Sequence, residues 1–198
     1  MSRILWMPLI AAMSVLPGQT PAVKQTSPTA LLEEQRDDAA GFKDFAERVQ
    51  TYIKLERSVE SGLPALKATD LPEMIAAHQH ALARKLREAR PGAKRGDLFT
   101  APASEAFRHA SRATFEGPKA ASSRAYMQSD APDPAMPLAV NDVYPDMAPV
   151  TPLSPELLAA YPPLPPEVAY RIVGRTLLLM DAKSNMVIDF ARLILPAE

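Results

Sequence analysis

The sequence contains no cysteine. This absence excludes disulfide bonds, thiolate metal sites, a cysteine nucleophile and a lipid-modified N-terminal cysteine. The sequence also lacks an excess of either charge. Its formal net charge is −1, which provides no long-range attraction to nucleic acid or to basic partners. Because of this charge balance, we expect no nucleic-acid partner. The apolar run at residues 4–16 is shorter than the roughly 20 residues that cross a bilayer comfortably.

The composition permits one modest domain with appendages. The chain has 198 residues, of which 47% are hydrophobic, so a packed core is feasible. Its 21 prolines are about twice the average usage. Without disulfides, any exported form has to be stabilised by packing alone.

Residues 1–22, MSRILWMPLIAAMSVLPGQTPA, have the layout of a secretory signal peptide. Arg3 precedes the apolar run, and small or polar residues follow it, with a cleavage site after Ala22. Two alternatives stay open: a buried N-terminal helix, which Pro8 and Pro17 disfavour, and an uncleaved membrane anchor. We expect a periplasmic or secreted protein, with residues 23–38 as a flexible lead-in.

Residues 39–131 are predicted to form the helical part. From about Ala39 to Ser61, apolar residues recur at three- and four-residue steps, which predicts an amphipathic helix. Asp70 is predicted to cap a second helix that ends at residues 90–92, with Glu73 completing a capping box, so the two helices form a helical hairpin. Asp97 is predicted to shape a turn, and Thr100 to cap a third helix that lies on the surface. Residues 116–128 are ambiguous.

Residues 132–166 hold eleven prolines in 35 positions. Proline removes a backbone donor, so neither a long helix nor a central strand is expected here. Ser154 and Pro155 predict a short helix at 154–161. A disordered linker is one reading, but interleaved apolar residues favour a segment that wraps the body (Val140, Val143, Tyr144 and Met147).

Residues 167–198 are predicted to form a three-stranded antiparallel β-meander and a tail. Gly174 and Arg175 suit a two-residue type II′ turn, which pairs Ile172 with Leu177. A four-residue loop, AKSN, then pairs Leu179 with Ile188 and Leu177 with Phe190, with Asp181 and Asn185 shaping the turn. One face is predicted to be apolar, whereas Asp189 is placed on the polar face near Arg171; the apolar face comprises Tyr170, Ile172, Leu177, Leu179, Met186, Ile188 and Phe190.

Three stretches of the sequence carry a resemblance to a family: GDLFTAPA, YPPLPPEVAYRIVGRTLLLMDAKSNMVIDF and the closing ILP. The second follows the pattern Y-R-x-V-G-x-x-L-x-L-x-D-x-x-x-N-x-x-x-D-F. Together they resemble an uncharacterised family of exported bacterial proteins. The similarity covers most of the chain after residue 40. The resemblance implies export and a shared fold, and it implies no activity.

The sequence offers few candidates for catalysis or metal binding. His78 and His80 lie about 200° apart around a helix and cannot ligate one ion together, and His109 is the only other histidine. The acids Asp181 and Asp189, with Asn185, do not match an EF-hand loop. Nucleophile, zinc-protease and phosphate-loop motifs are missing from the sequence. We therefore predict no catalytic residue, metal or cofactor, but a small enzyme using Asp97, or Asp181 with Asp189, stays open.

Residues 84–95 form the strongest local cluster of charge. They contain six basic residues and one acid. The ordinary explanation is a solvated helix end whose cations complement the helix dipole. The alternative is contact with anionic lipid headgroups or another envelope component; the residues are Arg84, Lys85, Arg87, Arg90, Lys94 and Arg95.

These patterns predict an α+β domain over residues 39–198. A helical hairpin and a surface helix pack on a C-terminal antiparallel meander, with a proline-rich segment between them. The first functional hypothesis is an exported, non-enzymatic module of unknown function that acts through binding or as structure in the cell envelope. The second is the small periplasmic enzyme.

Overall fold

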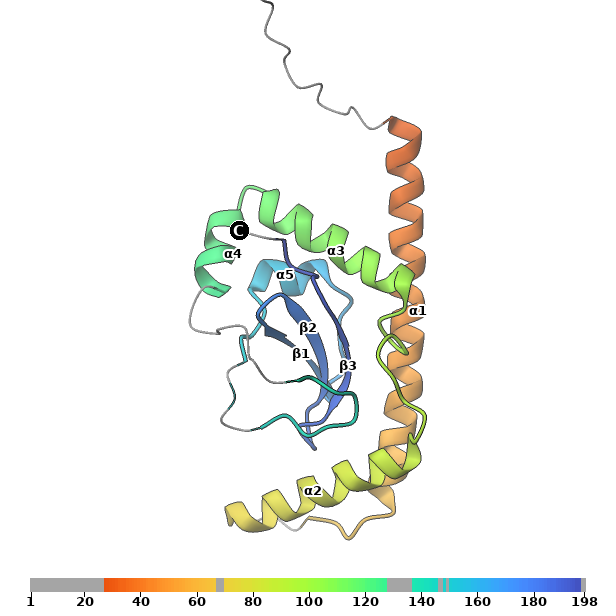
Figure 1. Ribbon diagram of the computed structural model, residues 1–198, viewed down its shortest axis with the longest axis vertical. Coiled ribbons are helices and arrows are strands. Elements are labelled where there is room, and N and C mark those ends of the chain that lie inside the picture. The colour runs from red at the N-terminus through yellow and green to blue at the C-terminus, as the bar shows by residue number, and fades with distance from the viewer. Residues whose placement is uncertain (1–26, 67–69, 128–136, 146–147, 149, 197–198) are drawn as a thin grey trace, which may run out of the picture.

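The computed structural model describes residues 27–66, 70–127, 137–145, 148 and 150–196. It confirms the α+β class: helices combine with an antiparallel sheet of order β1-β2-β3 (Figure 1). The helices are α1 (Pro28–Ser61), α2 (Pro72–Ala89), α3 (Ala101–Glu116), α4 (Ala120–Met127) and α5 (Pro155–Ala160), and the strands are β1 (Val168–Val173), β2 (Thr176–Asp181) and β3 (Val187–Ala191). Within the described part of the chain, no helix is both long and apolar enough to cross a membrane.

Helix α1 runs along the length of the body, with the sheet on one side of it (Figure 1). α3 crosses α1 closely: a Cβ atom added to Gly41 would lie 2.8 Å from the backbone oxygen of Pro102. A side chain at this position would separate the two helices. α2 completes the helical hairpin, because its Leu82 and Leu86 pack against Val59 near the end of α1.

The β1–β2 pairing is the predicted one. Tyr170 pairs with Leu179 and Ile172 with Leu177. The turn between the strands begins at Gly174, whose φ of 55° is readily adopted by glycine. A type II′ turn has a positive φ at its first central residue only. Arg175, the second central residue, has no positive φ, so the turn fits this type.

The predicted β2–β3 register is wrong over most of its length. A β-bulge between Leu179 and Met180 shifts the pairing, so that Leu179 lies opposite Asp189 and Leu178 opposite Phe190. Ile188 is the extra residue of the bulged strand, and such a residue breaks the strict alternation of sides. Phe190 therefore moves to the opposite face, and Asp189 is buried on the helix-facing side.

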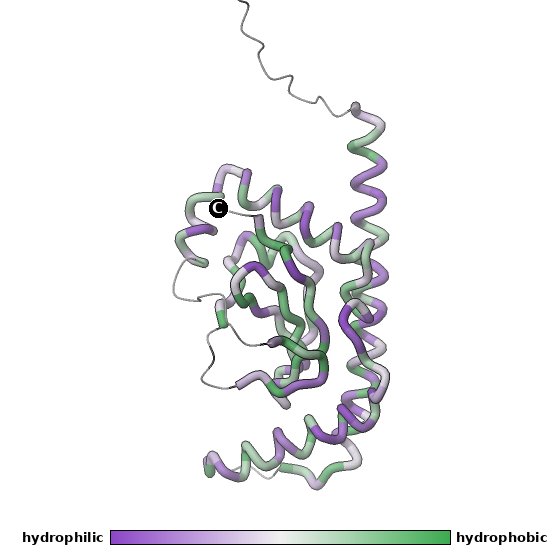
Figure 2. Tube along the Cα trace, in the orientation of Figure 1, coloured by the Kyte–Doolittle hydropathy of each residue, from purple (hydrophilic) through white to green (hydrophobic). Residues whose placement is uncertain are grey.

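Both faces of the sheet are covered. The helix-facing side packs Tyr170, Ile172, Leu177, Leu179 and Ile188 against an aromatic cluster centred on Phe107, which is 0% exposed although α3 lies at the surface. The rings of Phe45, Phe99, Tyr161 and Tyr170 all lie within 6 Å of the Phe107 centroid. The strands are accordingly hydrophobic over much of the trace, whereas hydropathy alternates along α1 (Figure 2).

The second face of the sheet is buried under part of the proline-rich segment. Tyr144 is 3% exposed and packs with Leu178, Met180 and Phe190, and Leu138, Val140 and Ala148 flank it. Met147 lies outside the described residues. Ser154 caps α5 by accepting a hydrogen bond from the Leu157 N–H. Met186, predicted for the apolar face of the sheet, packs instead with Leu82 and Leu86 of α2.

Two local predictions at helix starts are wrong. Residues 28–38 are helical rather than a flexible lead-in, because Ser27 caps α1 and Pro28 occupies its first turn. His109 of α3 also contacts Asp38 at 2.9 Å, which holds this part of α1. Asp70 does not cap α2: Pro72 suits the first helical position, so the cap falls on Leu71, which makes no side-chain capping bond. Residues 1–26, including the predicted signal peptide, lie outside the described residues.

Candidate functional site

Two of the six residues in the predicted basic cluster make hydrogen bonds within the protein. Arg87 donates to the carbonyl oxygen of Asn141 at 2.9 Å, and Arg90 donates to Asn141 Oδ1 at 2.9 Å. The guanidinium of Arg90 also lies over the Tyr52 ring, 5.1 Å from its centroid, and burial lowers its pKa. These two arginines hold the 137–145 segment against α1 and α2. The other four basic residues are exposed, and Lys85 is paired with Glu88 at 2.7 Å; they are Arg84, Lys85, Lys94 and Arg95.

Asp189 and Asp97 do not converge on a common site. The Asp189 side chain is fully buried and accepts hydrogen bonds from the backbone N–H groups of Gly96, Leu98 and Phe99 at 2.8–2.9 Å, and from Phe190. Asp97 instead closes its turn by accepting the Lys94 N–H at 2.9 Å. Thr100 caps α3 as predicted. Asp189 thus fixes the 96–99 loop to the sheet and is saturated by backbone donors.

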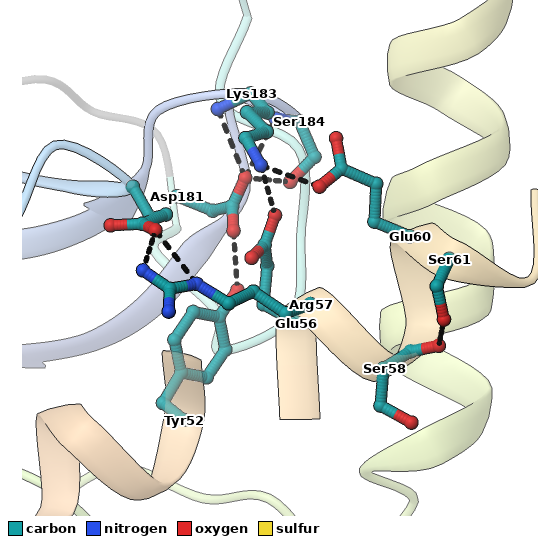
Figure 3. A network of polar contacts seen from close by, with 10 residues as sticks. Tyr52, Glu56, Arg57, Ser58, Glu60, Ser61, Asp181, Lys183 and Ser184 are labelled. Carbon is teal, nitrogen blue, oxygen red and sulfur yellow. Dashed lines mark hydrogen bonds and ion pairs between the residues drawn. The ribbon is translucent and has the colours of Figure 1, made fainter. Parts of the chain in front are cut away.

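Asp181 is the centre of a second buried network, which joins α1 to the β2–β3 turn (Figure 3). One carboxylate oxygen accepts the Tyr52 hydroxyl at 2.7 Å, and the other accepts the Ser184 N–H, the Ser184 hydroxyl and the Lys183 N–H. Burial and the neighbouring carboxylate raise the pKa of Tyr52 far above its ordinary value. As predicted, Asp181 accepts turn amides, and Asn185 leaves the turn at a φ of 52°.

Glu56 is the unexpected member of this network. Its side chain is 0% exposed, and Lys183 Nζ lies 3.0 Å from its Oε1. Lys183 also donates to Glu60 at 2.6 Å (Figure 3). Neither carboxylate oxygen of Glu56 has a well-oriented hydrogen-bond donor within the described part of the chain. Since a buried charge without full pairing is costly, the pKa of Glu56 is raised, chiefly by burial and against the opposing effect of Lys183.

The raised pKa of Glu56 predicts a specific pH dependence of stability. A carboxyl group whose pKa is higher in the folded state stabilises the fold below its unfolded pKa, here about 4.5, and this contribution is lost as the pH rises through the folded value. Urea unfolding of the wild type and of Glu56→Gln, measured between about pH 4 and 8, should show the stability difference moving in favour of the variant as pH rises. A difference that is flat, or that moves toward the wild type, contradicts this assignment; Glu60→Gln, at a half-exposed neighbour, is the matched control.

A groove lies between α5 and the outer edge of β1. Its volume is about 570 Å³, most of its lining residues are apolar, and Arg171 is the charged one among them; the apolar residues include Leu153, Leu158, Pro163, Leu164 and Val168. The hydroxyl groups of its two tyrosines are engaged elsewhere, because Tyr161 bonds to Ser111 at 2.6 Å and Tyr170 donates to the Pro162 carbonyl at 3.1 Å. The volume of the groove lies within the range of about 300–1,000 Å³ that small-molecule sites occupy.

Arg171 does not lie near Asp189 as the sequence predicts. It pairs with Leu178 in the sheet and donates to the carbonyl oxygen of Tyr170 at 2.8 Å. The ion pairs found within the described part of the chain do not include Arg171. The groove therefore carries one positive charge that is not neutralised by these pairs.

Comparison of the chain with protein-family models, curated proteins and solved structures gave no match. The resemblance to exported bacterial proteins thus stays a prediction. Across the described ranges, no three histidine or acidic residues are grouped so that they could hold a metal ion.

Sequence reasoning missed two features of these sites. The groove depends on α5 and β1 approaching one another after the proline-rich turn at 162–166, which leaves no local pattern. Glu56 did leave a signal: it follows Tyr52 by four positions and Ile53 by three, which places it on the buried face of α1. An acid at such a position indicates a buried partner.

Proposed function

We propose that the protein is an exported, non-enzymatic module of the cell envelope that acts by binding a ligand in the α5–β1 groove. The observation that carries this proposal is the apolar groove with Arg171 as its one charge among the described lining residues. The signal-peptide layout of residues 1–22 supports export. The hypothesis that residues 84–95 contact lipid headgroups is weakened, because Arg87 and Arg90 donate hydrogen bonds to Asn141.

The alternative, a small periplasmic enzyme, has less support. Asp97, Asp181 and Asp189 are each occupied by hydrogen bonds to the turns they shape. A general acid or base has to reach a substrate proton within hydrogen-bond distance. Asp189 and Asp181 are 0% and 1% exposed, so neither offers such access.

The binding proposal is tested with immobilised protein that begins at residue 23. Envelope extract is passed over the wild type and over Leu158→Arg, which places a long cation in the groove at a residue that is 52% exposed. We expect a component that the wild type retains and the variant loses. Identical retention by both proteins would contradict a binding role for the groove, and Leu31→Arg, at an exposed apolar residue of α1, is the control for an added charge.

Export predicts that the mature protein lacks tryptophan. Trp6 is the only tryptophan of the chain, and cleavage after Ala22 removes it. Protein recovered from the exported fraction should therefore have an intact mass starting at Val23 and no indole fluorescence. A chain expressed from residue 23 is the control and should stay inside the cell; retention of residues 1–22 in the membrane fraction would favour the anchored alternative.

A further inference from the structure

The outer edge of β1 has an open position beside the groove. In an antiparallel pair, backbone groups face the partner strand and away from it at alternate residues. Ile172 exchanges both of its backbone hydrogen bonds with Thr151 at 2.9 Å, so its polar groups face away from β2. Tyr170, two residues earlier, faces the same way.

The positions on either side of Tyr170 are already paired. Thr151 covers Ile172, and the Val168 N–H donates to the Pro165 carbonyl oxygen at 3.2 Å. Beyond Thr151 the chain leaves the edge, because Pro152 lacks an N–H and Ser154 caps α5, which begins at Pro155. The carbonyl of Tyr170 accepts from Arg171, but its N–H has no acceptor within the described part of the chain. Tyr170 and Arg171 both line the groove.

The groove thus presents two kinds of donor at one edge: a strand N–H and a guanidinium. Arg171 uses Nη1 for the Tyr170 carbonyl, which leaves further N–H groups of its planar fork for a carboxylate. Leu158, Pro163 and Leu164 provide the apolar surface beside them. A ligand that matches this arrangement combines an anionic end, a hydrogen-bond acceptor and apolar side chains.

We propose that the groove binds the C-terminal end of an extended apolar peptide chain. Its carboxylate pairs with Arg171, a backbone carbonyl oxygen accepts the Tyr170 N–H, and its apolar side chains lie against Leu158 and Leu164. A peptide fits better than a fatty acid because it offers a backbone carbonyl oxygen for the strand N–H in addition to its carboxylate, whereas a fatty acid has to satisfy both donors with one carboxylate group. Capture of chain ends by backbone donors and strand edges is an established mode of recognition. This inference rests on the proposed function of the groove.

The test uses fluorescein-labelled Ala-Leu-Val-Ala-Leu as the free acid and as the C-terminal amide, with binding followed by fluorescence anisotropy. The amide has no negative charge to pair with Arg171, so the wild type should bind the acid at least about ten-fold more tightly than the amide. Arg171→Met should abolish the preference, and Arg171→Lys should restore part of it. Thermal unfolding of each variant checks that the fold is retained.

The outcomes separate this inference from the proposed function. If acid and amide bind equally and Leu158→Arg abolishes both, the carboxylate role is wrong while the groove still binds. If laurate binds more tightly than the peptide and depends on Arg171, the occupant is a fatty acid and the peptide proposal is overturned. If neither peptide binds the wild type, this inference fails, and the envelope-extract experiment then decides on the groove itself.

Discussion

Replacing Asp189 with alanine is expected to lower the free energy of unfolding by about 4 kcal/mol. The substitution leaves the N–H groups of Gly96, Leu98 and Phe99 without their acceptor. Two of these hydrogen bonds are buried, where a donor without a partner costs about 1–3 kcal/mol. It also removes the acceptor of the Phe190 N–H within β3. Urea unfolding followed by circular dichroism measures the loss.

Asp97→Ala is the matched control, because it removes an acid from the same loop. Asp97 accepts one turn N–H near the surface, from Lys94, so the expected loss is about 1 kcal/mol or less. Asp189→Asn should be intermediate, since its amide keeps one oxygen but turns an NH₂ group toward a backbone donor. Equal losses in Asp189→Ala and Asp97→Ala would show that Asp189 does not anchor the loop.

The failed prediction for Asp189 shows where sequence patterns lose information. Strict alternation along β3 predicts Ile188 on the apolar face and Asp189 on the polar face. The bulge at Ile188 removes that alternation, and burying the acid is tolerated because four N–H groups surround it. Three of these belong to residues 96–99, more than 80 positions earlier in the chain. Nothing local to β3 could have revealed them.

Local chemistry predicted other elements well. Gly174 fixes a tight turn, so the β1–β2 register follows from turn length and hydrophobic pattern together. Asp181, Thr100 and Ser154 act within three residues of their backbone donors, which a sequence pattern can capture. By contrast, the α5–β1 groove depends on how the proline-rich turn at 162–166 places α5 beside β1, and the backbone N–H of Tyr170 at its edge carries no residue signature.

Asp181 and Asp189 therefore play the same structural role at two neighbouring places in the sheet, because Asp189 lies opposite Leu179, two residues before Asp181. Asp189 ties β3 to the loop that precedes α3, and Asp181 ties the β2–β3 turn to α1. Both use a short carboxylate that accepts several donors, which stabilises irregular backbone where regular pairing ends. This shared structural role accounts for both acids inside an otherwise apolar sheet by their backbone contacts.

Replacing Asp181 with alanine is the second substitution with a large expected effect, about 3–4 kcal/mol of lost stability. It removes the acceptor of the buried Tyr52 hydroxyl and of the Lys183 and Ser184 N–H groups. Urea unfolding at constant pH and ionic strength measures the loss.

Tyr52→Phe is the control for this second prediction, because it removes the hydroxyl and keeps the ring beneath Arg90. Alone it should cost about 1.5–2 kcal/mol, the value of one buried hydrogen bond to a charged group. In the Asp181→Ala background it should cost much less, since the hydroxyl has already lost its acceptor, and the double-mutant cycle measures this coupling. Additive losses would mean that the Tyr52–Asp181 bond does not join α1 to the turn. Asp181 does not line the α5–β1 groove, so any peptide binding that the wild type shows there should survive Asp181→Ala wherever the variant remains folded.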